Sequence, residues 1–188
     1  MYVLFDLCFA CMVLMKQENI MNLSFKEYTF AEKHDYITHN EKYDKLRQVP
    51  RHGCTNTFDH SVRVAFLSSR LAKLVGVDPD SAAKVGLLHD FCLVDYHKDD
   101  KHVHNGRWYC FYHPEDAVIN SENEGFILSH VEKKAIWSHM FPLATSIPTS
   151  RLGYVLTLSD KIVATQESLV SAAESIRNIR FNRRKGII

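Results

Sequence analysis

The sequence predicts an all-α fold, a compact bundle of several helices. Apolar residues recur at the helical period in successive segments, and no segment shows the alternation of a half-buried strand. Gly and Pro are scarce, with 7 and 5 residues among 188, which disfavours a turn-rich β protein. The length suits one domain, and 46% apolar with 24% charged residues are ordinary values for a soluble globular protein.

The first residues form an apolar segment with two interpretations. Residues 1–15 are too few to span a bilayer and include Asp6, and they lack the basic start and cleavage site of a signal peptide. Residues 1–20 are therefore expected to be a helix that faces the core or a partner, or an over-extended start with Met21 as the natural first residue. Residues 21–188 are expected to form a single domain.

Two helical regions are expected next. Residues 16–50 are polar with scattered apolar positions, and they predict one or two amphipathic helices ending near Pro50. A clear helix follows, because apolar side chains share one face from His60 to Leu74, and Gly76 stands where a left-handed stop is usual. Three residues can cap its start: Thr55, Asn56 and Thr57.

The following helix has a well-marked start. Asp78 is expected to be its N-cap, and Pro79 takes the first helical position, where a missing N–H costs nothing. Its apolar face is expected to run through His89 to Leu93. Gly86, one turn before His89, would let a neighbouring helix approach closely.

Residues 95–112 lose the helical period and are expected to be a polar and then aromatic loop. Two interpretations stay open: a lid over a site, with Trp108 or Tyr112 stacking on a base, or a loop whose aromatic end fills the core. A helix is then expected to open at His113-Pro114, with His113 at its cap.

Two more helices complete the expected bundle. Gly125 ends the helix that begins at His113, and Ser129 with Glu132 forms a capping box for a helix that reaches His139. A last apolar helix starts near Ser150, and the basic tail after it is expected to be a helix that frays.

Polar side chains intrude on the apolar faces of these helices. Burying an unpaired carboxylate costs several kcal/mol or more. A divalent cation would compensate it and would also explain the eleven histidines, since imidazole is a common metal ligand. Imidazole with carboxylate suits Zn, Mn, Fe or Ni. The candidate metal ligands are His60, His89, Asp90, His113, His139 and Asp160.

Each candidate taken alone has an ordinary structural interpretation. A core histidine such as His60 is more often a hydrogen-bonded structural residue than a ligand, and His113 could simply cap a helix. Asp160 could pair with Lys161 or with an arginine. The ordered set, with each member pointing inward from a separate helix, favours a metal site over these alternatives.

Three segments carry a family resemblance: TFDHSVRVA, GLLHDF and LTLSDKIVA. They resemble the HD superfamily of metal-dependent phosphohydrolases over roughly residues 50–165. FYHPEDAV and IWSHMFPL match the extended H…HD…H…H…D pattern of its binuclear branches. The resemblance implies a multi-helix HD-type domain that binds one or two divalent transition-metal ions and hydrolyses a phosphomonoester or phosphodiester with a metal-activated water.

The resemblance also implies a role for each ligand. Asp90 would bridge two ions, with His60, His89 and Asp160 on one ion and the two remaining histidines, His113 and His139, on the other. The chain departs from the HD-GYP branch, where the His-Asp pair is followed by I-G-K, because Leu93 stands at the lysine position and no GYP element follows. Met140 also replaces the second of two consecutive histidines, so hydrolysis of a cyclic dinucleotide is not expected.

A phosphate group also needs donors from the protein. The expected catalytic residues are Asp90, His52 and Lys161. A bidentate arginine suits phosphate geometry. The expected substrate-binding residues are Arg51, His52, Arg63 and Trp108. The two arginines, His52 and Lys161 could equally be solvated or helix-capping side chains.

The expected substrate is a phosphorylated small molecule, nucleotide-like in character. A net charge of +1 gives no reason to expect a nucleic-acid partner, and no membrane partner is expected. Five cysteines without framework spacing suggest reduced thiols and a cytoplasmic location. The alternative to an enzyme is a non-catalytic metal-binding or ligand-sensing module. A third and weaker hypothesis is an interaction domain that uses the apolar start or the basic tail. Homo-oligomerisation is left open.

Overall fold

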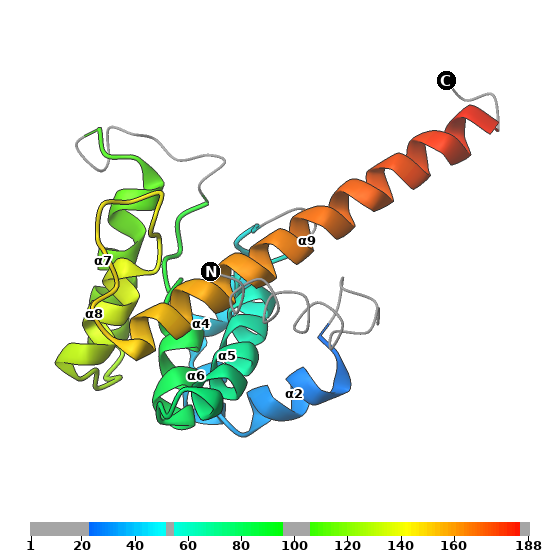
Figure 1. Ribbon diagram of the computed structural model, residues 1–188. Coiled ribbons are helices and arrows are strands. Elements are labelled where there is room, and N and C mark those ends of the chain that lie inside the picture. The colour runs from blue at the N-terminus through cyan, green and yellow to red at the C-terminus, as the bar shows by residue number, and fades with distance from the viewer. Residues whose placement is uncertain (1–22, 52–54, 96–105, 185–188) are drawn as a thin grey trace.

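A computed structural model describes residues 23–51, 55–95 and 106–184. Helices dominate these residues, and no β-strand occurs among them; Pro50 and Asn56 form an isolated antiparallel bridge. The helices pack into one body, from which the long last helix projects (Figure 1). The expected all-α class is confirmed.

The region before Pro50 differs from the one or two helices expected there. It forms four short segments: α2 (Phe25–Glu32), α3 (Asp35–Thr38), α4 (Glu41–Asp44) and the 3₁₀ helix η1 (Lys45–Gln48). The helical period breaks because Asn40 stops one turn and caps the next, its side chain accepting from the amides of Lys42 and Tyr43. The buried Tyr43 hydroxyl donates to the Leu87 carbonyl at 2.7 Å, which fixes this region to the body.

Helices α5 (Thr57–Leu74) and α6 (Pro79–Leu88) form the centre of the body. Of the three candidate caps it is Asn56 that starts α5, accepting from the Asp59 amide at 2.8 Å. Gly86 allows the close approach expected of it, because a Cβ there would lie 2.5 Å from Ala65 Cα. Helix α6 ends earlier than expected, so His89 is its C-cap and Leu93 lies beyond it.

Helix α7 (Tyr109–Asn123) begins earlier than the expected start at His113-Pro114. Trp108 is the N-cap, and Pro114 lies inside the helix. The aromatic end of the preceding segment adds a turn, because Tyr112 is buried at 1% exposure and the Tyr109 ring stacks on His113. The expectation that His113 caps the helix was therefore wrong.

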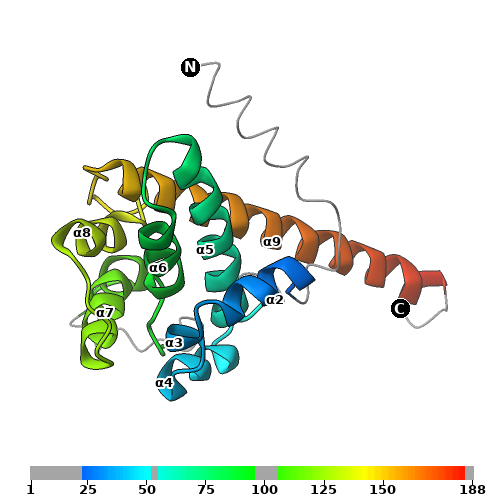
Figure 2. The same cartoon turned by 90° about the horizontal axis from the view of Figure 1, so that it is seen from below.

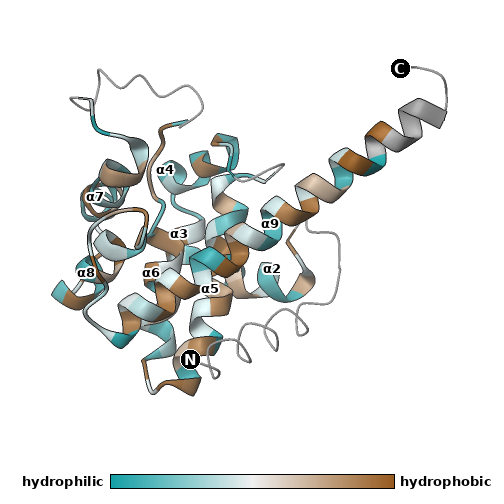
Figure 3. Cartoon of the chain, turned by 45° about the horizontal axis from the view of Figure 1, so that its top comes forward, coloured by the Kyte–Doolittle hydropathy of each residue, from teal (hydrophilic) through white to brown (hydrophobic). Residues whose placement is uncertain are grey.

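Helix α8 (His130–Ser138) begins at the expected capping box of Ser129 and Glu132. Helix α9 (Arg151–Arg184) begins where the sequence predicted and runs without interruption to the last described residue. Its first half packs on α5 and α8, and its second half leaves the body (Figures 1 and 2). This projecting part carries both hydrophobic and hydrophilic residues (Figure 3).

None of the described helices is both long enough and apolar enough to cross a membrane.

Candidate metal centre

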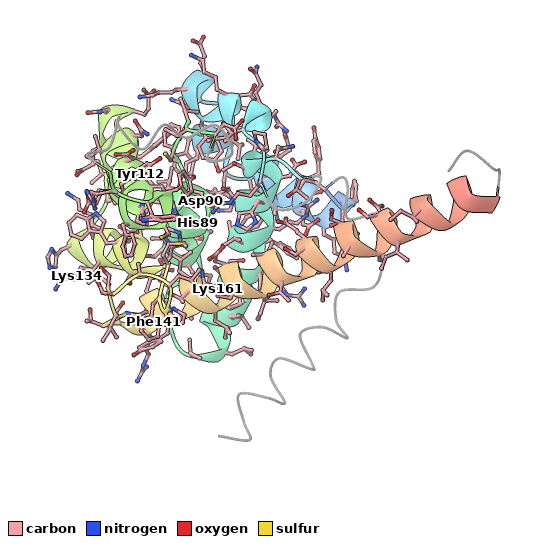
Figure 4. The ribbon with its side chains drawn as sticks, turned by 90° about the horizontal axis from the view of Figure 1, so that it is seen from above. His89, Asp90, Tyr112, Lys134, Phe141 and Lys161 are labelled. Atoms are coloured by element: carbon pink, nitrogen blue, oxygen red, sulfur yellow. The ribbon has the colours of Figure 1, made fainter. Side chains whose placement is uncertain are left out.

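Five helices bring the six expected metal ligands into one buried cluster. Helix α5 supplies one histidine, the C-terminal end of α6 supplies the His-Asp pair, α7 and the end of α8 supply one histidine each, and α9 supplies an aspartate. Figure 4 shows His89 and Asp90 inside the body where these helices meet. All six are at most 2% exposed: His60, His89, Asp90, His113, His139 and Asp160.

The ligand atoms form two groups that share Asp90. Asp90 Oδ2 lies 3.1 Å from His89 Nε2 and 3.6 Å from His60 Nε2. Asp90 Oδ1 lies 3.2 Å from His113 Nε2 and 3.6 Å from His139 Nε2. One carboxylate oxygen therefore faces each pair of imidazoles, an arrangement suited to two neighbouring cations.

Asp160 extends the group of His60 and His89. Its Oδ1 lies 3.2 Å from His60 Nε2 and 3.8 Å from His89 Nε2. The first group thus offers two imidazoles and two carboxylates, whereas the second offers two imidazoles and the shared carboxylate of Asp90.

All four imidazoles are oriented by a hydrogen bond at Nδ1. His89 and His139 are the C-caps of α6 and α8, and each ring bonds to the carbonyl three residues earlier. The four pairs are His89 with the Gly86 carbonyl at 2.8 Å, His113 with Tyr109 at 2.7 Å, His139 with Ile136 at 2.7 Å and His60 with the Glu167 carboxylate at 2.9 Å. Because each partner accepts, Nδ1 is the donor in each ring, and in a neutral ring Nε2 then directs a lone pair into the cluster. Without a cation, Asp90 and Asp160 outweigh the effect of burial and raise the pKa of His89 to about 9, so a bound cation would take the place of that proton.

Buried polar atoms in this cluster support a cation site. Among the described residues, His89 Nε2 and Asp90 Oδ1 are buried without a hydrogen-bond partner. Buried polar atoms are normally satisfied, and neutral imidazole nitrogen with carboxylate oxygen is a common ligand set for divalent transition metals. The side chains present therefore fit a divalent cation.

The protonation states of the two aspartates and of His139 also suit a bound cation. Burial raises the pKa of Asp90, but Arg51 and His89 outweigh this and hold it well below its usual value. Burial likewise raises the pKa of Asp160, but the neighbouring His60 and His89 outweigh this and hold it well below its usual value. Burial is the largest effect on His139 and lowers its pKa well below the usual value, and the neighbouring His89 and His113 act in the same direction. Both aspartates are carboxylates at neutral pH, and His139 is a neutral imidazole.

Comparison with known proteins gives the family. The model of the HD domain matches residues 57–165, more than half of the chain. The chain belongs to the HD-domain family. The match confirms the resemblance drawn from the ordered H…HD…H…H…D motif, and it spans helices α5 to α8 and the first part of α9.

The HD domain is also similar to part of several curated proteins named ribonuclease Y. The protein of Mycoplasma mycoides is 30% identical over 128 residues, which are 66% of this chain and 29% of the relative. Those of Clostridium novyi and Opitutus terrae are 29% and 30% identical over 129 and 102 residues, covering 25% and 19% of the relatives. The aligned region is less than a third of each relative. No solved structure gives a significant match.

Two of the expected phosphate donors contact the aspartates of the cluster. Arg51 is 5% exposed; its guanidinium contacts Asp90 Oδ2 and donates to the Tyr109 hydroxyl at 3.2 Å. Lys161 Nζ lies 2.7 Å from Asp160 Oδ2, and its side chain is 33% exposed. Arg51 thus brings positive charge to the shared carboxylate, and Lys161 reaches from the cluster toward solvent.

The other expected donors are placed differently. Arg63 is buried and lies 2.8 Å from Glu167 Oε1, so it contacts the group on the Nδ1 side of His60, opposite the cluster. Trp108 is 63% exposed at the start of α7. His52 lies outside the described residues, as do residues 96–105 of the segment considered as a lid.

Sequence reasoning missed two residues that contact the cluster. Tyr109 stacks on His113 with ring centroids 4.3 Å apart and planes 8° apart. Glu167 contacts His60, and its pKa lies below the usual value because His60 and Arg63 outweigh the effect of burial. The seven-residue spacing from Asp160 to Glu167 was the available signal, because residues two helical turns apart share one face.

Proposed function

We propose that this HD domain is a phosphohydrolase that uses one or two divalent transition-metal ions, Fe, Mn, Zn or Ni, to hydrolyse a phosphomonoester or phosphodiester of a small, nucleotide-like molecule. One observation carries the proposal: Asp90 presents one carboxylate oxygen to each of two pairs of imidazoles whose Nε2 atoms converge.

The ligand assignment follows these contacts. His60, His89 and Asp160 would hold one ion with Asp90, and the two histidines of α7 and α8 would hold a second. A bound divalent ion lowers the pKa of water toward about 7 and neutralises charge on phosphoryl oxygens. The imidazoles add no charge to the ion, whereas the two carboxylates of the first group would offset part of its positive charge and fix its position.

Positive side chains of the domain would bind the substrate. Arg51 offers a planar guanidinium beside Asp90, and a guanidinium can donate two parallel hydrogen bonds to a phosphate. Lys161 offers an ammonium beside Asp160 and is partly exposed, so it can meet an incoming phosphate before that phosphate reaches the buried ligands. Together they supply charge on two sides of the cluster.

Turnover of model phosphoesters tests the proposal. The purified chain is assayed with p-nitrophenyl phosphate and bis-p-nitrophenyl phosphate in the presence of Mn²⁺, Fe²⁺, Ni²⁺ or Zn²⁺. Metal-dependent turnover is expected, and D90A is expected to abolish it while circular dichroism shows an unchanged helical fold. Full activity in D90A, or no turnover with any of the metals, would overturn the proposal; metal binding without turnover would favour a ligand-sensing module.

A pair of lysine variants tests the substrate site. K161Q is expected to raise KM for the preferred phosphoester about ten-fold, because a charge-assisted hydrogen bond contributes roughly 1.5–3 kcal/mol. K134Q is the matched control, since Lys134 lies at the outside of α8, away from His89 and Asp90 (Figure 4). Equal KM in both variants would remove Lys161 from the substrate site.

RNA is the second candidate substrate, and one observation favours it: the relatives that match are named ribonuclease Y. RNA is also a phosphodiester, so the same ligand set and the same two cationic side chains would serve. A short RNA oligonucleotide is therefore assayed beside a mononucleotide and a dinucleotide. Preference for the oligonucleotide would replace the small-molecule proposal.

A further inference from the structure

Glu167 contacts His60 on the side of the ring that faces away from the other candidate ligands. It belongs to α9, seven residues after Asp160, and is 2% exposed. Two helical turns separate these positions, so both side chains leave α9 on one face. Asp160 Oδ1 lies 3.2 Å from Nε2 of His60, and Glu167 Oε2 lies 2.9 Å from Nδ1. Helix α9 therefore contacts both nitrogens of one imidazole carried by α5.

The acceptor at Nδ1 of His60 differs in kind from the acceptors of the other three histidines. Those three donate to backbone carbonyls, which are neutral, whereas His60 donates to a carboxylate. A carboxylate bonded to the second nitrogen of a ligating histidine fixes the tautomer and the ring orientation, and it makes the ligating nitrogen more basic. His60 is thus the most strongly supported imidazole of the cluster.

The carboxylate of Glu167 is itself held in place by two buried donors. Arg63 Nη1 lies 2.8 Å from Oε1, and Thr55 Oγ1 lies 3.3 Å from Oε2. Arg63 is 4% exposed and Thr55 is 9% exposed. Rotation of Glu167 away from His60 would break the buried ion pair with Arg63, so the carboxylate is pre-oriented for the imidazole.

We propose that Glu167 is a positioning residue, which holds His60 with Nε2 directed at the cluster and raises the affinity of the first ligand group for a divalent cation. The inference rests on the proposed function, since it requires that His60 binds a cation. Glu167 would touch neither the cation nor the substrate, and Arg63 would hold the carboxylate of Glu167 in place.

Titration with Co²⁺ tests this without any assay of turnover. The chain is stripped of metal, and the visible absorption of bound Co²⁺ is followed in the parent and in E167Q, which keeps the shape and an acceptor oxygen but loses the charge. E167Q is expected to raise the Kd for Co²⁺ about 10- to 100-fold, the usual cost of removing such a partner. Unfolding of the same samples in urea measures stability separately.

The matched control is E132Q. Glu132 is also a buried glutamate in an ion pair, 2.8 Å from Lys84 Nζ, but it lies at the start of α8 and caps a helix. E132Q is expected to lose stability and to bind Co²⁺ as the parent does. If E132Q and E167Q weaken Co²⁺ binding equally, the effect reflects stability and the positioning role is overturned.

A second readout follows the tautomer of His60. The metal-stripped chain is labelled with ¹⁵N-histidine and measured at a pH where the His60 ring is neutral, since Asp160 and Glu167 lie at its two nitrogens. The Nδ1–H form is expected in the parent and in E167Q, and a shift toward the Nε2–H form in E167A. Co²⁺ binding by the parent and E167Q with the same Kd overturns the inference alone. Failure of the parent to bind Co²⁺ overturns the proposed function, and the inference with it.

Discussion

The Nε2 atoms of His113 and His139 lie 3.0 Å apart, and each ring uses its Nδ1 proton on a backbone carbonyl. Two lone pairs at this distance repel each other unless a cation or a proton lies between them. The pair therefore forms the core of the second ligand group, with Asp90 Oδ1 as its carboxylate.

The assignment of His113 and His139 to a second ion can be tested by counting the ions bound per chain. Elemental analysis after loading with Mn²⁺ is expected to give two ions per chain in the parent and one in H139Q, because the group of His60, His89 and Asp160 stays complete. His130 lies exposed at the start of α8, so H130Q is the control and is expected to keep two ions. Two ions in H139Q would contradict the assignment.

Removal of Arg51 is expected to destabilise the metal-stripped chain. Arg51 and Asp90 form a buried ion pair, and removing one partner of such a pair costs about 3–5 kcal/mol. R51M should show this loss in urea unfolding, and added Mn²⁺ should recover much of it, since the cation compensates Asp90. Arg177 pairs with Glu174 on the surface at 3.8 Å, so R177M should change stability by less than about 1 kcal/mol. Equal losses in the two variants would refute the compensation argument.

The approach of α5 and α6 predicts a cost for one added methyl group. G86A would place a Cβ 2.5 Å from Ala65 Cα, a backbone atom that cannot move aside, and overpacking of this kind costs about 1–3 kcal/mol. G153A is the matched control, because its added Cβ would lie 3.2 Å from a side-chain atom of Pro148. Urea unfolding is expected to show a larger loss for G86A. Since backbone atoms make the clash, A65G should not restore stability.

The capping box of α8 predicts a dependence of stability on pH. Burial raises the pKa of Glu132, but hydrogen bonds from Lys84 and Ser129 outweigh it and leave the pKa below its ordinary value of 4.5. The folded chain therefore binds this proton less readily than the unfolded chain does. The stabilisation by Glu132 is complete above pH 4.5 and is lost as the pH falls through the lower folded value. The free energy of unfolding of E132Q should fall less steeply below pH 4.5; an identical slope would contradict this.

Local signals in the sequence were sufficient for several elements of the fold. The caps at Asn56, Asp78 and Ser129 are side chains that accept from amides two or three residues away, so the short-range pattern contains the whole interaction. The predicted start of α7 was wrong, because tertiary packing and not a local pattern decides where this helix begins. Pro114 is usual at a first helical position, but buried Tyr112 and the ring stacked on His113 added a turn before it.

The candidate site likewise has features that the sequence could predict and features that depend on long-range packing. The six ligands could be named because each interrupts an apolar face with a polar group, and the resemblance supplied their order. The resemblance also implied that Asp90 joins the two groups, but the distances from its two oxygens to the imidazoles depend on the packing of five helices and could not be predicted. The same holds for Arg63, expected at the substrate, whose contact with Glu167 joins residues 104 positions apart.

The distance along the chain between His60 and Asp160 has a consequence for how the site comes into being. These two ligands are 100 residues apart and meet only when α9 docks on α5. A chain still emerging from the ribosome, or one cleaved before α9, lacks the last carboxylate and cannot close the first ligand group. Closure of the first ligand group is thus a late step of folding, which requires that α9 is already docked on α5.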